Sequence, residues 1–131
     1  MTAGSARLRT HDAQTVLDRH LGCFAAGDLE GLLADYTDES VLFTVDGPLR
    51  GPAAIRGFME RLFAEFAKPG ARFDLRTKDV GEDVAFIVWS AETADNRYEI
   101  ANDTFVVRDG RILFQSFAGK IVPRRAAEAA A

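Results

Sequence analysis

Cysteine, histidine and long apolar runs are scarce in this sequence, and each scarcity excludes a class of protein. The one cysteine, Cys23, has no partner for an internal disulfide and no companions for a structural zinc site. Two histidines, His11 and His20, are too few for a metal constellation, so we expect no metal and no other cofactor. The longest apolar runs, such as Val84–Trp89, fall far short of the roughly 20 residues that a membrane helix needs.

An excess of positive charge is also missing. Sixteen basic residues against 20 acidic ones give a net charge of −4, without the cluster of lysine and arginine that nucleic-acid binding requires. The start of the chain lacks the basic and apolar pattern of a secretory signal, so we expect a cytoplasmic protein without a membrane partner. With 131 residues and 47% apolar content, we predict one domain over 10–122, flanked by flexible tails at 1–9 and 123–131.

Three segments in the first half of the chain have helical periodicity. Apolar residues recur at steps of three and four in Val16–Phe24, Leu29–Tyr36 and Ile55–Phe66. Asp28 can cap the second segment, and Gly51-Pro52 opens the third because proline at the first helical position loses no hydrogen bond. A short strand, Val41–Val45, is predicted between the second and third helices.

Strands follow from Ala71 onward. Apolar and polar residues alternate over Phe73–Lys78, and the turn signals at 81–83, 95–96 and 109–110 separate three further strands at 84–93, 97–108 and 111–121. Helices followed by an antiparallel meander indicate an α+β fold, with three N-terminal helices packed on one face of a curved, mostly antiparallel sheet.

The turn at 95–96 predicts which residues of the first long hairpin share a face. If Asp95 and Asn96 form a two-residue turn, Val88 lies opposite Asp103 and Phe86 lies opposite Phe105. The second face then carries residues such as Ile87, Trp89 and Ile100. Because both faces are largely apolar, we predict a homodimer through that second face, with coverage by a loop or the C-terminal tail as the alternative.

Two ionisable residues stand in apolar surroundings. Asp103 lies mid-strand, with apolar Ala101 and Phe105 as its neighbours on the same face, where an ionised carboxylate is costly unless it is paired or neutral. His20 falls on the buried stripe of the first helix. Each alone is most simply a core residue with satisfied hydrogen bonds, but two such groups that converge in one pocket indicate a functional site.

Several short motifs carry a family resemblance over residues 12–121. Ala26-Gly27-Asp28-Leu29, Trp89-Ser90-Ala91-Glu92, Asn102-Asp103-Thr104-Phe105 and Asp109-Gly110-Arg111-Ile112 occur in the order and spacing of the nuclear transport factor two-like superfamily. Through these motifs the chain resembles the SnoaL-like and ketosteroid isomerase-like branch. The resemblance implies a cone-shaped barrel with a deep pocket between the helices and the concave sheet.

The resemblance also implies roles for individual residues. Asp103 matches the aspartate that acts in the ketosteroid isomerases as a neutral hydrogen-bond donor to an oxyanion, a case that serves as a general example of a protonated buried acid. This chain departs from those isomerases at two positions. His20 stands where they carry a tyrosine, and Thr44, which cannot accept a proton, stands where they carry the base; Asp46 would replace it only if its loop bent inward. Steroid isomerisation is therefore not expected.

The predicted site combines these residues with an apolar lining. We expect His20, Asp103 and Tyr36 to be the catalytic groups. A three-residue turn with Gly110 in a bulge would set Gln115 opposite Asp103, and the resemblance favours it over a two-residue turn that presents Phe114 and Ser116. The ligand-pocket residues are expected to be Phe24, Thr44, Phe58, Phe86, Val88, Phe105, Gln115 and Phe117.

Two functions fit this site. The first is a small-molecule pocket protein that binds an apolar, carbonyl-bearing ligand, with cyclase-like or isomerase-like acid–base catalysis by His20 and Asp103. The alternative is a non-catalytic protein, either a ligand-binding module or a dimeric scaffold with a filled core.

Overall fold

The structure, a computed structural model, describes the backbone of residues 3–124 and the side chains of residues 13–124. The helix α1 begins at Ala3, inside the segment for which the sequence predicted a flexible tail. The last strand ends at Pro123, and the rest of the predicted C-terminal tail, residues 125–131, lies outside the described residues.

Three helices precede or interrupt the early strands, as the periodicity predicted, but the second ends at Leu33, so that Tyr36 begins a strand instead of ending the helix. They are α1 (Ala3–Ala26), α2 (Leu29–Leu33) and α3 (Pro52–Ala67). Asp28 caps α2, because its Oδ1 accepts a hydrogen bond from the Gly31 amide at 2.9 Å. Gly51 precedes α3 with a φ of 86°, a left-handed conformation that favours glycine, and Pro52 occupies the first helical position.

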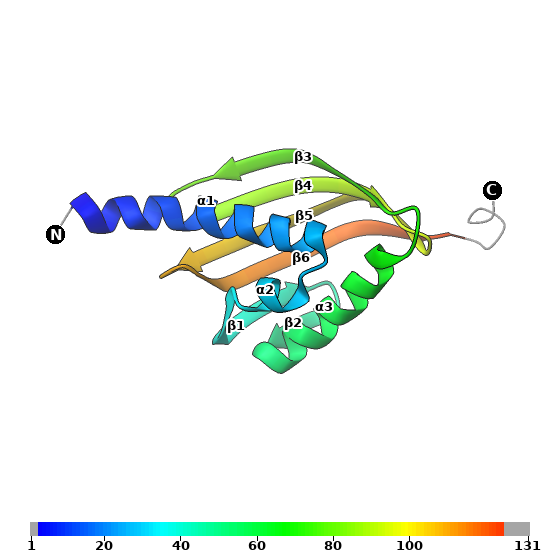
Figure 1. The fold of residues 1–131 in the computed structure, drawn as a ribbon, viewed down its shortest axis with the longest axis horizontal. Helices are drawn as coiled ribbons and strands as arrows, with labels where there is room; N and C mark the ends of the chain where they lie inside the picture. Colours follow the sequence, from blue (N-terminus) through cyan, green and yellow to red (C-terminus); the bar gives the residue numbers. More distant parts are fainter. Residues whose placement is uncertain (1–2, 125–131) are drawn as a thin grey trace.

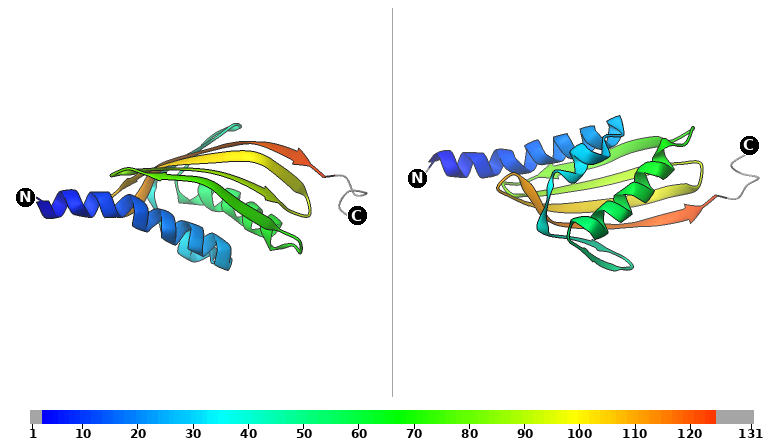
Figure 2. Two further views of the ribbon diagram at one scale, coloured as in Figure 1. Left: turned by 90° about the horizontal axis from the view of Figure 1, so that it is seen from above. Right: turned by 60° about the horizontal axis from the view of Figure 1, so that its bottom comes forward.

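Six strands form one sheet. They are β1 (Tyr36–Thr44), β2 (Gly47–Arg50), β3 (Arg72–Val80), β4 (Val84–Glu92), β5 (Asn96–Arg108) and β6 (Arg111–Pro123), in the order β2-β1-β6-β5-β4-β3. Every neighbouring pair is antiparallel except β1 and β6. Figures 1 and 2 show a curved sheet with the helices on one face, which confirms the α+β architecture of three helices on a mostly antiparallel sheet.

The predicted register of the β4–β5 hairpin is wrong by one residue. Ile87, not Val88, lies opposite Asp103, and Ala85 lies opposite Phe105. The connection is wider than two residues, since the Thr93 amide donates to the Asn96 carbonyl at 2.9 Å, and a bulge between Trp89 and Ala91 shifts the pairing again. A shift of one residue moves every β4 side chain to the other face. The inner face therefore carries Ala85, Ile87, Trp89 and Ala91.

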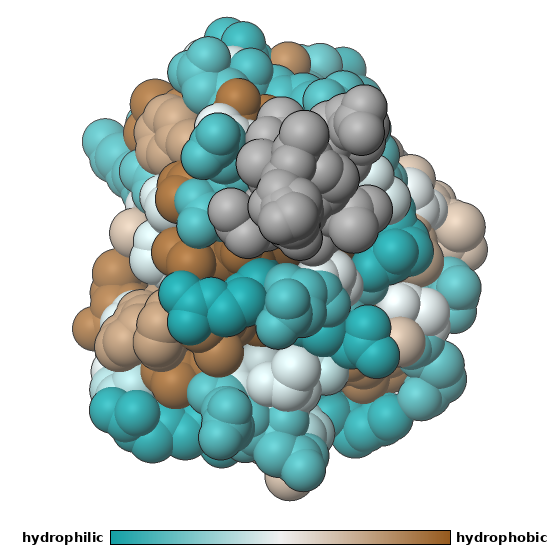
Figure 3. All heavy atoms as spheres, turned by 90° about the vertical axis from the view of Figure 1, so that its left-hand side faces the viewer, coloured by the Kyte–Doolittle hydropathy of each residue, from teal (hydrophilic) through white to brown (hydrophobic). Residues whose placement is uncertain are grey.

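The same correction removes the surface predicted for the homodimer. Ile87 and Trp89 are buried under the helices, whereas Ile100 is 53% exposed on the outer face. These three residues do not share a face and cannot form one dimer surface. A homodimer therefore stays a prediction, but the surface through which it would form is not assigned. The exposed hydrophobic residues of the sheet include Phe43, Ile100 and Phe114. Figure 3 shows hydrophobic surface gathered along the left-hand side of the view.

In the β5–β6 hairpin, Gln115 lies on the predicted inner face, but the turn and the pairing differ from those predicted. Arg108 pairs with Arg111, so Asp109 and Gly110 form a two-residue turn, each with a positive φ, rather than the predicted three-residue turn. A bulge between Val106 and Val107 then brings Gln115 to the inner face. Gln115 lies opposite Phe105, not opposite Asp103. The pairing was wrong by two residues, and a shift of two preserves the face.

Candidate active site

A cavity of about 50 Å³ lies between α1, α3 and the inner face of the sheet. Its volume holds a few water molecules and is well below the roughly 300 Å³ at which small-molecule sites begin. The polar groups at its wall come from His20, Asp103, Gln115 and the indole of Trp89. The apolar lining consists of Leu21, Phe24, Leu32, Phe58, Met59, Leu62, Phe73, Ile87, Phe105 and Phe117.

Asp103 is the central polar group of this wall. It is 7% exposed, and its two oxygens accept different donors. The Trp89 Nε1–H donates to Oδ1 at 2.8 Å, and the Gln115 Nε2–H donates to Oδ2 at 2.9 Å. Both donors are uncharged, so they fix the orientation of the carboxyl group without balancing a negative charge.

Burial raises the pKa of Asp103 above its usual value. The hydrogen bonds from Trp89 and Gln115 and the charge of a protonated His20 oppose this rise and do not cancel it. The neutral carboxylic acid is therefore favoured more here than in water. A neutral Asp103 has an O–H to donate, and Asp103 lines the cavity.

Tyr36 extends the network behind Asp103. Its hydroxyl donates to the Gln115 Oε1 at 2.5 Å, which orients the amide so that its nitrogen faces Asp103. Burial raises the pKa of Tyr36 well above 10, with the charges of Asp103 and Asp35 adding to the rise. Tyr36 is thus a hydrogen-bond donor that supports the site through Gln115, and it does not itself line the cavity.

His20 lies at the cavity wall on α1, with its ring edge-on to Tyr36 and Phe105 at centroid distances of 6.1 and 5.2 Å. Its Nδ1 is 3.9 Å from Oδ2 of Asp35, in the turn between α2 and β1. That distance is too long for a hydrogen bond, and neither atom has another partner within the described residues. The other oxygen of Asp35 accepts from the Arg19 Nε–H at 2.7 Å.

Comparison with known proteins places this site in a family. The model of the SnoaL-like domain matches residues 17–114, about three quarters of the chain. The chain belongs to the SnoaL-like domain family. This match confirms the resemblance drawn from the sequence motifs. No curated protein matches the chain in sequence.

Solved structures share the fold of this SnoaL-like chain. An NTF2-like protein of unknown function from Mesorhizobium loti superposes with a TM-score of 0.73 at 23% identity, over 86% of this chain and 93% of that one. SalBIII, an epoxide hydrolase/cyclase-like enzyme, gives 0.72 at 13% identity over 87% and 97%. TerC, co-crystallised with polyporic acid, gives 0.66 at 15% identity over 83% and 92%. At these identities the likeness shows the fold.

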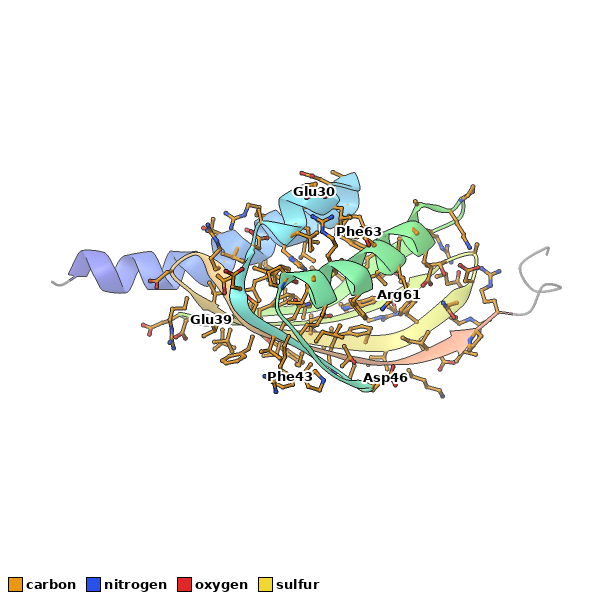
Figure 4. The ribbon with its side chains drawn as sticks, turned by 90° about the horizontal axis from the view of Figure 1, so that it is seen from below. Glu30, Glu39, Phe43, Asp46, Arg61 and Phe63 are labelled. Carbon is orange, nitrogen blue, oxygen red and sulfur yellow. The ribbon has the colours of Figure 1, made fainter. Side chains whose placement is uncertain are left out.

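The cavity of the SnoaL-like domain gathers many of the residues singled out in the sequence. His20, Asp103, Phe24, Phe58, Phe105, Gln115 and Phe117 line it. Phe86 and Val88 do not, because the register of β4 turns them to the outer face. Thr44 is also outside the lining, and its hydroxyl donates to the Gly47 carbonyl at 2.9 Å. Asp46 is exposed at the tip of the β1–β2 hairpin (Figure 4) and does not replace the missing base.

Sequence reasoning missed Trp89, Asp35 and Arg19. Trp89 was assigned to the wrong face by the register error, although its single indole N–H marked it as a residue that needs a partner when buried. Asp35 follows a helix in a turn, a position where acidic residues are usually solvated, so nothing in the local pattern indicated its burial. The residues that the structure describes contain no group of three or more metal-ligating side chains and no helix able to span a membrane.

Proposed function

We propose that this SnoaL-like domain binds a small, apolar, carbonyl-bearing molecule and catalyses proton transfer at the carbon next to the carbonyl. The observation that supports it is Asp103, a buried carboxyl group whose pKa is raised, held by two neutral donors at the wall of an aromatic cavity. A neutral acid of this kind donates to an oxygen on which negative charge develops. As part of this proposal, the curved sheet and the helices form the cone-shaped barrel that the family resemblance implied.

The chemistry needs one base and one donor. His20 would remove a proton from the carbon next to the carbonyl, and the C–H electron pair would become the C–C double bond of an enolate. The Asp103 O–H would donate to the enolate oxygen. When the imidazolium exchanges its proton with solvent before the carbon is reprotonated, the result is exchange at that carbon, and reprotonation further along a conjugated system gives isomerisation. No other reactant is required.

The size of the cavity limits which part of the ligand it takes. About 50 Å³ accommodates the carbonyl end of a ligand but not a ring system. Phe24 lines this cavity and also lines two hollows of about 240 and 210 Å³. Displacement of the Phe24 ring would join them into a site of ordinary ligand size. We therefore expect a flat, multi-ring ligand whose carbonyl reaches Asp103 and whose rings lie at Phe24.

Related proteins offer support by analogy. SalBIII, described as an epoxide hydrolase/cyclase-like enzyme with a role in pyran ring formation, and TerC, co-crystallised with polyporic acid, carry small-molecule chemistry or ligands on this fold. Fold analogy alone does not establish a function, so the site residues must decide it.

The test uses 2-tetralone, a two-ring ketone with acidic protons next to its carbonyl. Exchange of those protons for deuterium in D₂O is followed by NMR. We expect the wild-type protein to accelerate exchange, and His20→Ala and Asp103→Asn each to reduce the acceleration by on the order of 100-fold. Asp79→Asn, an exposed carboxylate on β3, is the matched control and should leave the rate unchanged.

The non-catalytic alternative makes a different prediction. If the protein only binds its ligand, 2-tetralone or 2-naphthol raises the melting temperature, no exchange is accelerated, and Asp103→Asn keeps the stabilisation. That outcome would contradict the catalytic proposal and leave the binding site in place. A homodimer stays a separate prediction, without an assigned surface, and static light scattering of the purified protein tests it.

A further inference from the structure

Two buried polar atoms lack partners in the described part of the chain, and they face each other. They are Nδ1 of His20 and Oδ2 of Asp35, 3.9 Å apart. Asp35 is 1% exposed and His20 is 6% exposed, so water does not readily satisfy either atom. Buried polar groups are nearly always hydrogen-bonded, and an approach of about 1 Å would bring this pair to hydrogen-bond distance.

The surroundings of Asp35 determine which of its atoms is available. Its Oδ1 is held by Arg19, with contacts of 2.7 Å from Nε and 2.6 Å from Nη2. Arg19 also donates to the Gly110 carbonyl at 3.4 Å, so the guanidinium is fixed between α1 and the β5–β6 turn. Backbone bonds fix Asp35 itself, since its amide donates to Leu32 and its carbonyl accepts from Ile112. Only Oδ2 remains, and it faces the imidazole.

The charge of Arg19 already balances the carboxylate of Asp35. The hydrogen bond that Oδ2 lacks therefore requires a donor and not a second cation. A neutral imidazole with a proton on Nδ1 gives Oδ2 the donor that it lacks. The opposite ring nitrogen, Nε2, is then unprotonated.

We infer that Asp35 is a positioning residue that holds His20 with its proton on Nδ1 and leaves Nε2 as the base at the cavity. The imidazolium that forms when Nε2 takes a proton would be stabilised by the Asp35 carboxylate behind it. The catalytic part of this inference rests on the proposed function. The tautomer of His20 does not, and it can be measured without a substrate.

The measurement is a ¹⁵N–¹H correlation spectrum of the full chain labelled at histidine. The chain has only one other histidine, so His11→Gln leaves a single imidazole to assign. We expect the neutral His20 ring to show a protonated Nδ1 and an unprotonated Nε2. A neutral ring protonated on Nε2, or a ring that stays doubly protonated up to the pH of unfolding, would overturn the inference.

Asp35→Asn gives an isosteric test. Arg19 needs an oxygen to accept its hydrogen bonds, so the amide nitrogen of Asn takes the place of Oδ2 and donates to Nδ1. We expect this variant to move the proton to Nε2 and to slow tetralone exchange by on the order of 100-fold while 2-naphthol still binds. An unchanged tautomer would contradict the inference. If no variant and no wild-type protein accelerates exchange, the proposed function fails and the tautomer still decides the role of Asp35.

Discussion

The carboxyl groups of Asp103, on β5, and Glu65, which accepts hydrogen bonds from β5, have different surroundings, and the difference separates a candidate catalytic group from a structural one. Glu65, on α3, accepts from Tyr98 at 2.9 Å, from Thr93 at 2.6 Å and from Asn96 at 2.9 Å. Those donors leave no unmatched buried atom around it within residues 13–124. Glu65 thereby ties the end of α3 to the turn between β4 and β5.

Around Asp103, by comparison, the hydrogen bonding is incomplete. Asp103 has two neutral donors and a raised pKa, and the adjacent His20 and Asp35 each keep a buried atom without a partner. A satisfied polar network stabilises and specifies a fold, whereas unsatisfied groups at a cavity wall cost stability and are kept where a ligand or a proton completes them. Phe66 connects the two regions, because its ring contacts both Phe24 and Tyr98 at centroid distances of 5.0 and 5.5 Å.

The largest expected effect on stability comes from breaking the satisfied end. Glu65→Ala removes the acceptor of three side chains and should lower the free energy of unfolding by about 2–3 kcal/mol. Glu60→Ala, an exposed glutamate on the same helix, is the control and should change it by less than about 0.5 kcal/mol. Urea denaturation measures both. Loss of tetralone exchange in a folded Glu65→Ala protein would contradict the conclusion that Glu65 has only a structural role.

The second prediction concerns the pH dependence of stability at the Asp103 end. Because the folded pKa of Asp103 lies above its unfolded value, its stabilising contribution is complete below about pH 4 and is lost as the pH rises through the folded pKa. The unfolding free energy of wild type relative to Asp103→Asn should fall with pH, by up to about 1.4 kcal/mol per unit. Urea denaturation of both proteins from acid to neutral pH measures it. A difference that rises with pH would show that the folded pKa is lowered.

Phe24→Ala tests whether the cavity and the flanking hollows join. The variant should bind a three-ring phenol about tenfold more tightly relative to 2-naphthol than the wild type does, because the ring that lines all three spaces is gone. Phe86→Ala, on the outer face, is the control. Fluorescence titration gives both affinities. Equal losses for both phenols would show that Phe24 is only part of the core.

The smallest expected effect is that neither tyrosine ionises near pH 10 in the folded protein. The chain has two tyrosines, and both have raised pKa values: Tyr36 through burial and the nearby charges of Asp103 and Asp35, and Tyr98 through burial and the charge of Glu65. The ultraviolet signal of tyrosinate should therefore stay flat through pH 10 in the folded protein and appear in urea near that pH. A tyrosine that ionises near pH 10 in the folded protein would show that one of the two networks is open to water.

The helices and the ionisable residues in apolar surroundings were predictable because the sequence patterns that indicate them are local. The spacing of Val16, His20 and Phe24 places them on one stripe of a helix whatever that helix packs against. Asp103 was conspicuous because the nearest residues on its own face of the strand, Ala101 and Phe105, are apolar. The faces of β4 were not predictable, because the width of the turn after Glu92 and the bulge at Trp89 depend on the hydrogen bonds of Thr93 and on packing against α3.

By itself, the sequence determined the α+β class, the order of the elements apart from the short strand β2, and the two groups His20 and Asp103, because periodicity, capping and apolar context act over a few residues. The inward orientation of Gln115 and Phe117 was expected only from the family resemblance. The tertiary structure decided which neighbours complete those groups. Trp89 reaches Asp103 only through the observed register, and Asp35 reaches His20 only because the turn before β1 packs against α1. Contacts between residues far apart in the chain depend on how whole elements pack, which no local pattern encodes.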